Sequence, residues 1–230
     1  MLNIKKIIND PVSSNCYVIS TVNNKSCIVV DPGTENCREL LDYLQQYDLC
    51  PDYIFLTHEH VDHIIGCEEL QRHYEAMIVC SSNCASAMQS SKFNLTRMTE
   101  QWEERLTMPA ANIVLENIDY QLTWGDYVIK FYPAEGHSTG SICFTIGEKL
   151  FVGDTLIKGY KTTTVLPGAS KEKLVPTLEY ILHNFDPDKT KIYPGHFEPF
   201  YLKEVLLEIY EQIEFLKNKI HKKNLQNQSV

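Results

Sequence analysis

The feature that most constrains this 230-residue chain is the segment THEHVDH at 57–63, which directly follows an apolar, β-rich run at 53–57. It holds four side chains that can bind metal: His58, His60, Asp62 and His63. In a loop that leaves a strand, the first two can turn inward together while the last two point to a neighbouring position. Imidazoles suit zinc, iron or manganese, and carboxylates suit harder ions or bridge two ions. So dense a cluster favours a site for two metals over a solvated charged loop.

Three further ligand candidates each stand in a loop after an apolar run: His137, Asp154 and His196. A lone histidine in a loop is seldom a ligand, and Gly-Asp after a strand is more often a turn. Each of these residues is therefore weak evidence by itself.

Short β-rich runs and helical patterns alternate along the chain. Strands are expected at 15–21, 26–30, 53–57, 76–80, 118–122, 127–132, 141–146, 150–152 and 191–193. Helices are expected at 35–47, 64–74, 171–184 and 200–219. The first part has the order ββαβ, and most strands of the second part form antiparallel meanders. This order favours two mixed sheets with helices outside over a doubly wound parallel sheet, which needs regular β–α alternation.

The length permits one large domain or two small ones, and we expect a single domain over 1–230. The segment 81–117 is rich in Ser, Asn and Thr and only weakly helical around 98–106. It is predicted to be a helical insertion, and either a lid over the site or a surface segment without a role.

The net charge and the hydropathy pattern limit the classes of molecule that this protein is expected to bind. A formal net charge of −9 disfavours nucleic acid. No run approaches the ~18 apolar residues of a membrane span, and the N-terminus lacks a signal-peptide pattern. We expect a cytoplasmic protein with a small-molecule substrate and no membrane partner, and the oligomeric state stays open. The eight cysteines are expected to be reduced core thiols, and a zinc site at Cys80 and Cys84 is disfavoured.

In chain order, the candidates resemble the five motifs of the metallo-β-lactamase superfamily. The matching positions are Asp31, the cluster at 58–63, His137, Asp154 and His196. The resemblance spans about residues 10 to 200. Within the superfamily the chain is most similar to the glyoxalase II-like branch, through 57–66 and 151–156.

The resemblance implies a fold and a ligand set. The fold is an α/β four-layer αββα sandwich of two mixed sheets, with the site at one edge between the sheets. His58, His60 and His137 would hold the first metal, and Asp62, His63 and His196 the second. Asp154 would bridge both ions. Asp31 would orient the ligand loop without binding metal, as second-shell support requires.

The same resemblance implies a binuclear metal-dependent hydrolase with two divalent ions, zinc first and iron or manganese as alternatives. A water that bridges two cations loses its proton near neutral pH and becomes the nucleophile, while the cations polarise the carbonyl. Asp62 is expected to accept a hydrogen bond from that water. No serine or cysteine nucleophile is needed.

A thioester or other small activated acyl compound is the favoured substrate, and a lactone is the nearest rival. Phosphodiester chemistry fits the acidic charge poorly, and a di-iron redox centre usually needs a flavin partner domain. Asp154 counts against β-lactamase activity, because the common antibiotic-hydrolysing members resemble this pattern but have a cysteine near that place. Only one helix and a polar tail follow His196, so the glutathione-binding domain of true glyoxalase II is not expected. Lys158 and Lys161 could meet an anionic substrate.

Overall fold

The computed structural model describes residues 1–22, 24–98, 108–116 and 120–228. The chain divides into two compact units, each with its own sheet and helices. The first unit is Met1–Ile118 with Gly195–Phe197, and the second is Asp119–Pro194 with Glu198–Val230. The single domain expected from the sequence stays a prediction.

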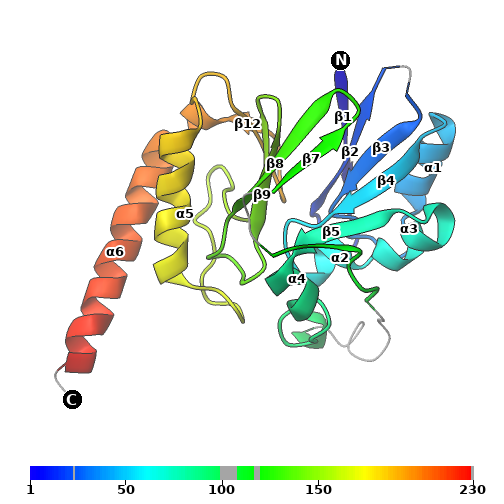
Figure 1. The fold of residues 1–230 in the computed structure, drawn as a ribbon. Helices are drawn as coiled ribbons and strands as arrows, with labels where there is room; N and C mark the ends of the chain where they lie inside the picture. The colour runs from blue at the N-terminus through cyan, green and yellow to red at the C-terminus, as the bar shows by residue number, and fades with distance from the viewer. Residues whose placement is uncertain (23, 99–107, 117–119, 229–230) are drawn as a thin grey trace. The chain divides into compact units, whose positions relative to one another are not determined.

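The first unit contains a mixed six-stranded sheet in the order β1-β2-β3-β4-β5-β6 (Figure 1). Its strands are β1 (Leu2–Ile8), β2 (Asn15–Thr21), β3 (Ser26–Val30), β4 (Cys50–Phe55), β5 (Met77–Ser81) and β6 (Ile113–Leu115). The pairs β1–β2 and β2–β3 are antiparallel, and the pairs from β3 to β6 are parallel. The parallel strands β3 and β4 therefore end at the same edge, and the loop 57–63 leaves from there.

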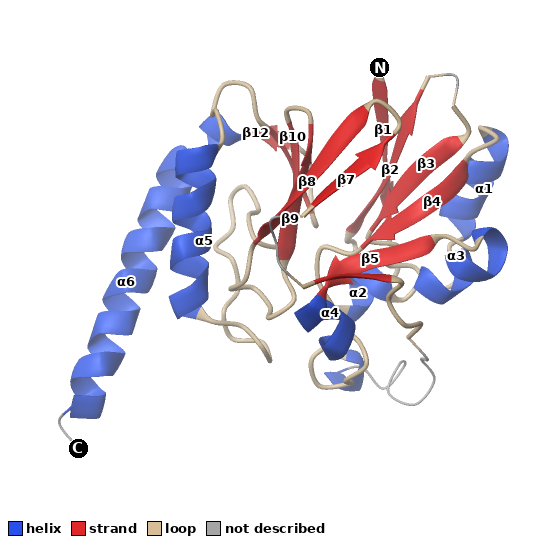
Figure 2. Ribbon diagram, in the orientation of Figure 1, coloured by secondary structure: helices blue, strands red, loops and turns tan. Residues whose placement is uncertain are grey.

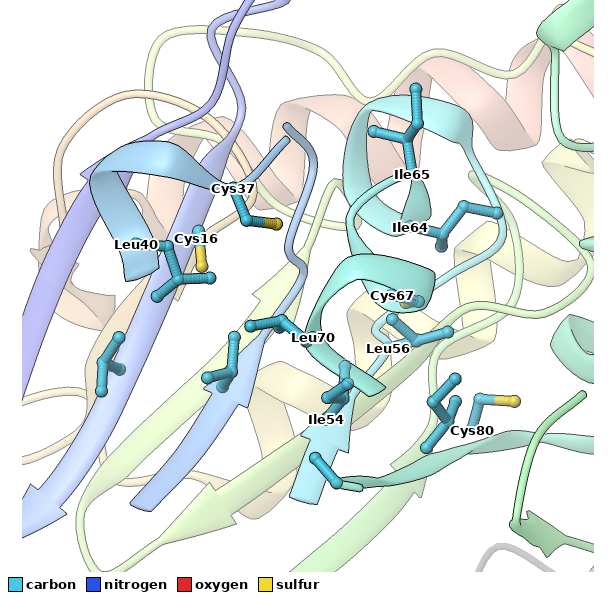
Figure 3. Close-up of a cluster of buried hydrophobic side chains, with 14 of the residues drawn as sticks. Cys16, Cys37, Leu40, Ile54, Leu56, Ile64, Ile65, Cys67, Leu70 and Cys80 are labelled. Carbon is cyan, nitrogen blue, oxygen red and sulfur yellow. The ribbon is translucent and has the colours of Figure 1, made fainter. Parts of the chain in front are cut away.

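Short helices accompany this sheet. They are α1 (Arg38–Gln46), α2 (Val61–Ile64), α3 (Cys67–Tyr74), α4 (Ser82–Ala87) and the 3₁₀ turn η1 (Thr96–Met98). Leu40 and Leu44 of α1, four positions apart, face the same core as Leu70 of α3. Figure 3 shows this cluster, with Ile54 and Leu56 at the end of β4 packed near α3. The packing fixes the strand end from which the ligand loop begins.

The second unit contains another mixed six-stranded sheet, in the order β12-β11-β10-β9-β8-β7. Its strands are β7 (Gln121–Trp124), β8 (Tyr127–Pro133), β9 (Ile142–Ile146), β10 (Lys149–Gly153), β11 (Lys191–Pro194) and β12 (Phe200–Tyr201). Only β10–β11 is parallel, so most of the sheet is the expected meander.

Two long helices cover one face of the second sheet and lie side by side (Figure 2): α5 (Lys171–Asn184) and α6 (Leu206–Gln228), the latter after a 3₁₀ turn η2 (Leu202–Glu204). Ser170 starts α5, because its hydroxyl accepts a hydrogen bond from the amide of Lys173. On the strands, the ring of Phe151 stacks on Phe144 at 4.6 Å and on Tyr193 at 4.7 Å between centroids. The contacts between these buried rings join β9, β10 and β11 close to the turn that carries Asp154.

The predicted class, an α/β fold with two mixed sheets and helices, is confirmed. The strand β1 was not expected, because the adjacent Lys5 and Lys6 interrupt the alternation of its apolar residues. Pro51 was expected to precede its strand but lies within β4, next to a register shift between Cys27 and Ile28. Such irregularities tolerate a residue without an amide hydrogen.

Other boundaries were also wrong. The helix expected at 64–74 is two helices, and the first begins at Val61, inside the predicted loop. The first residues of the helix expected at 200–219 form the strand β12 and the 3₁₀ turn η2 instead. The helix α6 starts after them and continues to Gln228. Within 81–117, β6 pairs in parallel with β5 and so extends the sheet. The helical pattern at 98–106 and the strand start at 118 fall almost wholly outside the described residues, and the lid stays a prediction.

All eight cysteines are free thiols, as expected, and seven are buried. Burial raises the pKa of Cys37 to about 12 and raises that of Cys16 and Cys67 well above the ordinary value. They serve as small apolar side chains in the core of the first unit (Figure 3). Among the described helices, none combines the length and the apolar character that a membrane crossing requires.

Candidate metal centre

The loop after β4 carries several ligand candidates, and burial and a backbone hydrogen bond hold it in place. Thr57, His58, His60 and His63 are all buried, and α2 begins just after His60. The amide of Val61 donates to the carbonyl of Asn94 at 2.9 Å, which fixes the start of that helix. This bond therefore holds the middle of the HEHVDH sequence in place.

Asp31, at the end of β3, anchors this loop. It is 2% exposed and has a positive φ of 50°, which Asp tolerates better than most residues. Its carboxylate accepts hydrogen bonds from the amide of Thr57 at 2.8 Å, from the Thr57 hydroxyl at 2.6 Å and from Nδ1 of His63 at 3.1 Å. The orienting role expected of Asp31 thus has a direct structural basis.

These contacts fix the tautomers of two imidazoles. A carboxylate without a proton can only accept, so Nδ1 of His63 carries its hydrogen and Nε2 of the neutral ring carries the lone pair. The Thr57 hydroxyl donates its one hydrogen to Asp31, so Nδ1 of His58 donates to Thr57 at 3.0 Å. Metal-binding histidines commonly donate their second N–H in this way.

His196 is held in the same state by the main chain. Its Nδ1 lies 3.0 Å from the carbonyl of Ser13, which can only accept. Nε2 of His196 therefore has the lone pair and lies 3.5 Å from Oδ2 of Asp62, while Nε2 of His63 lies 3.4 Å from the same oxygen. Asp62, His63 and His196 form one candidate metal group, with ligand atoms within 4.8 Å of one another.

The spacing of these atoms fits a metal ion. Two bonds of about 2.0–2.1 Å that meet at a tetrahedral angle separate their ligand atoms by about 3.4 Å. The Asp62 distances match this value, and Nε2 of His58 lies 3.1 Å from Nδ1 of His60. Burial opposes the ionisation of Asp62, but His63 and His196, when Nε2 also carries a proton, outweigh it and hold the pKa of that carboxyl well below its usual range. A metal ion would replace those two protons. The donor set is thus ready to bind a divalent cation.

The second unit carries His137 and Asp154. Gly153, with φ of 50°, turns the chain at the end of β10 and places Asp154 at the strand end. Oδ2 of Asp154 lies 3.6 Å from Nε2 of His137. The hydroxyl of Thr155 donates to the carbonyl of Ala134 at 3.3 Å, so the two loops are joined within this unit.

Several expected site residues therefore come together. Within the first unit the structure gathers Asp31, His58, His60, Asp62, His63 and His196, and within the second it pairs His137 with Asp154. Cys80 and Cys84 belong to no metal group among the described residues. Lys158 is paired with Glu204 at 2.7 Å, and Lys161 lies over the ring of Phe215 at 4.2 Å, so both are engaged within their own unit.

The sequence did not single out Asn9, Ser14 or Asn94, which contact the backbone around the ligands. All three are buried. The available signal was a cluster of small polar residues at 9–15 between two strands, which resembles an ordinary turn.

Gly33 packs its backbone against the ligand loop, and we expect Gly33→Ala to disrupt the site. A Cβ at this position would lie 1.6 Å from the carbonyl oxygen of Asp62, so backbone has to move. We predict a loss of at least about 3 kcal/mol in the free energy of unfolding and a loss of bound metal.

Gly125→Ala is the matched control. It places alanine at a positive φ, but nothing lies within 4 Å of the new Cβ, so it should cost only about 1 kcal/mol. Denaturant unfolding and elemental analysis of both proteins measure the two effects. Equal losses in the two variants would contradict the close approach as the cause.

Comparison with known proteins agrees with this geometry. Residues 9–196 match the family model described as metallo-beta-lactamase superfamily. A probable polyketide biosynthesis zinc-dependent hydrolase of Bacillus velezensis is 30% identical over 221 residues, which cover 94% of this chain and 89% of that protein. A probable metallo-hydrolase of Bacillus subtilis is 27% identical over 188 residues, 81% of this chain and 86% of that protein.

Solved structures show the same fold. The B3 metallo-β-lactamase BLEG-1 has a TM-score of 0.81 at 22% identity, over 89% of this chain and 96% of that one. The ETHE1 protein of Myxococcus xanthus has a TM-score of 0.74 at 21% identity, over 94% of this chain and 90% of that one. At these identities the likeness shows the fold alone.

Proposed function

Because this chain belongs to the metallo-β-lactamase superfamily, we propose that it is a binuclear metal-dependent hydrolase of small activated acyl compounds, with a thioester as the favoured substrate. The observation that carries this proposal is the arrangement around Asp62. Two imidazoles, each with its Nδ1–H bonded to an acceptor, direct Nε2 toward one carboxylate. Such a set fits a divalent metal better than it fits a structural ion pair.

The proposed ligands follow the order of the family motifs. His58, His60 and His137 would hold the first ion, and Asp62, His63 and His196 the second. Asp154 would touch both. Its assignment rests on the motif order, and its 3.6 Å approach to His137 supports a role beside that histidine. Zinc is the favoured metal, since the Bacillus velezensis relative is named as zinc-dependent.

Divalent ions bound there would lower the pKa of a water molecule and polarise the scissile carbonyl. The protein's own groups act around that chemistry. The Asp62 carboxylate, ionised at neutral pH, accepts a hydrogen bond from the attacking water and so orients it. Asp31 keeps Nδ1 of His63 protonated throughout, because its carboxylate accepts that hydrogen. Hydrolysis then adds water across the acyl bond and yields an acid and a thiol or alcohol.

The glyoxalase II-like segments at 57–66 and 151–156 support the thioester. A lactone remains the second candidate, since the same ligands serve it. The hypothesis of an anionic acyl group rested on Lys158 and Lys161. It is weakened, because these lysines contact Glu204 and Phe215. Phosphodiester hydrolysis and di-iron redox chemistry are weaker alternatives.

A substrate panel on the metal-loaded protein tests the function. We expect about two metal ions per chain and ordinary enzymatic turnover of simple acyl thioesters, slower turnover of lactones, and little of phosphodiesters or β-lactams. Elemental analysis and an optical spectrum accompany the panel, since a colourless zinc protein excludes a di-iron redox centre. Inert thioesters beside active lactones would overturn the substrate, and less than one ion per chain after zinc supplementation would overturn the binuclear centre.

A further inference from the structure

The linker between β1 and β2 touches both segments that carry the Asp62 group of ligands. Residues 9–14 form this linker. Together with Asn15, the first residue of β2, the linker lies within the first unit, as Asp62 and His196 do. His196 stands far from the other two ligands in sequence, so something other than the local chain must set its distance from Asp62.

On one side the linker holds the main chain of Asp62. The hydroxyl of Ser14 donates to the Asp62 carbonyl at 2.5 Å, and Nδ2 of Asn9 donates to the same hydroxyl at 2.8 Å. Since Asn9 supplies one hydrogen to Ser14, the hydrogen of Ser14 itself is directed to Asp62. Nδ2 of Asn9 also lies 3.1 Å from the carbonyl of Asp31. Ser14 is fully buried, so water does not compete for these bonds.

On the other side the linker and Asn15, the first residue of β2, hold the loop of His196. The amide of Asn15 donates to the carbonyl of Gly195 at 2.6 Å, and the carbonyl of Ser13 accepts from Nδ1 of His196 at 3.0 Å. Nδ2 of Asn15 donates to the carbonyl of Phe197 at 2.8 Å. The two neighbours of His196 and its ring are therefore all bonded to the residues on either side of Ser14.

We propose that Ser14 is a positioning residue for the second metal, which sets the separation of Asp62 and His196 by joining the main chain of Asp62 to the linker that holds His196. This inference rests on the metal centre proposed above, but it does not depend on the substrate. Loss of the Ser14 hydroxyl frees the Asp62 carbonyl while the ligands themselves remain. The second ion should then bind more weakly, and the first, at His58 and His60, should be little affected.

The experiment is a zinc titration of the chelator-treated full-length protein by calorimetry, for wild type, Ser14→Ala, Ser14→Thr and Ser20→Ala. Removing a group that supports metal ligands typically lowers metal affinity about 10–100-fold. We expect Ser14→Ala to weaken the second zinc by that factor and the first by less than about threefold. Ser14→Thr keeps a hydroxyl and should restore most of the second affinity. Ser20→Ala removes another buried serine hydroxyl on β2 and should match wild type.

The proposal would be overturned by unchanged second-site affinity in Ser14→Ala, by equal weakening of both sites, or by a Ser14→Thr protein as weak as Ser14→Ala. Circular dichroism of each apo-protein ensures that folded samples are compared, and a Ser14→Ala protein that does not fold leaves Ser14→Thr against wild type as the deciding pair. A wild-type protein that binds two zinc ions yet hydrolyses no thioester would refute the proposed substrate and leave the role of Ser14 intact. A wild type that binds no second zinc would refute the role itself.

Discussion

Replacing Asp62 with alanine is expected to lower turnover at least about 1,000-fold. The carboxylate lies between Nε2 of His63 and Nε2 of His196, at 3.4 and 3.5 Å, and its pKa is held well below the usual range. The alanine variant loses a metal ligand and also the acceptor that orients water. Loss of a positioned proton acceptor alone typically costs about 100-fold to 10,000-fold.

Asp62→Asn separates these two roles. The amide keeps the size and one oxygen ligand, but it remains neutral and cannot take a proton. We expect Asp62→Asn to retain more zinc than Asp62→Ala while its kcat stays low. Zinc content and steady-state rates are measured on the same folded, monodisperse samples. An alanine variant that keeps two ions and wild-type kcat would contradict the assignment of Asp62.

Replacing Asp31 with asparagine is expected to lower turnover about 100-fold or more, although Asp31 is not proposed as a metal ligand. Its Oδ1 accepts from the fixed amide of Thr57, so in the variant the remaining oxygen must stay there. The new amide then takes the place of Oδ2 and meets Nδ1 of His63 as a second donor. The imidazole has to move its hydrogen to Nε2, the atom that should bind metal. A wrong histidine tautomer is costly in this way in other enzymes.

The matched control is Asp126→Asn, in the exposed turn between β7 and β8. Zinc titration, kcat and nitrogen NMR of the imidazoles give independent readouts. We expect the Asp31→Asn spectrum to show His63 in the other tautomer and the second zinc to bind more weakly, with no change in Asp126→Asn. If His63 keeps Nδ1–H and both ions stay bound, the tautomer argument fails.

The candidate ligands could be singled out from the sequence because they are concentrated and chemically distinctive. Four metal-binding side chains within 58–63, directly after an apolar run, are rare in a loop that binds nothing. The support around them could not be predicted in this way. Ser14 acts through a hydroxyl on a distant main-chain carbonyl, and Ser13 acts through its own carbonyl, which every residue possesses. Nothing in side-chain chemistry marks such a role.

The two sheets could be predicted from the alternation of hydrophobic residues. The errors in predicting individual strands have physical causes. In β1, the adjacent Lys5 and Lys6 break the alternation of apolar and polar residues that would have marked a strand. The strand β6 is only three residues long, too short for a period to register. Pro51 was treated as a stop, although a strand with a register shift accommodates it. In each case tertiary pairing outweighed local propensity.

His196 belongs to the first unit although the chain before and after it belongs to the second. The contact between its ring and Ser13 spans 183 positions, one of the longest separations between bonded residues in the molecule. Such long-range closure comes late in folding, because chain entropy must be lost before the contact forms. During synthesis, the segment that ends at Ile118 can shape its sheet and present Asp62 and His63 well before His196 leaves the ribosome. We therefore expect His196 to join Asp62 and His63 late in folding, and a chain released early would hold the first two candidate ligands without the third.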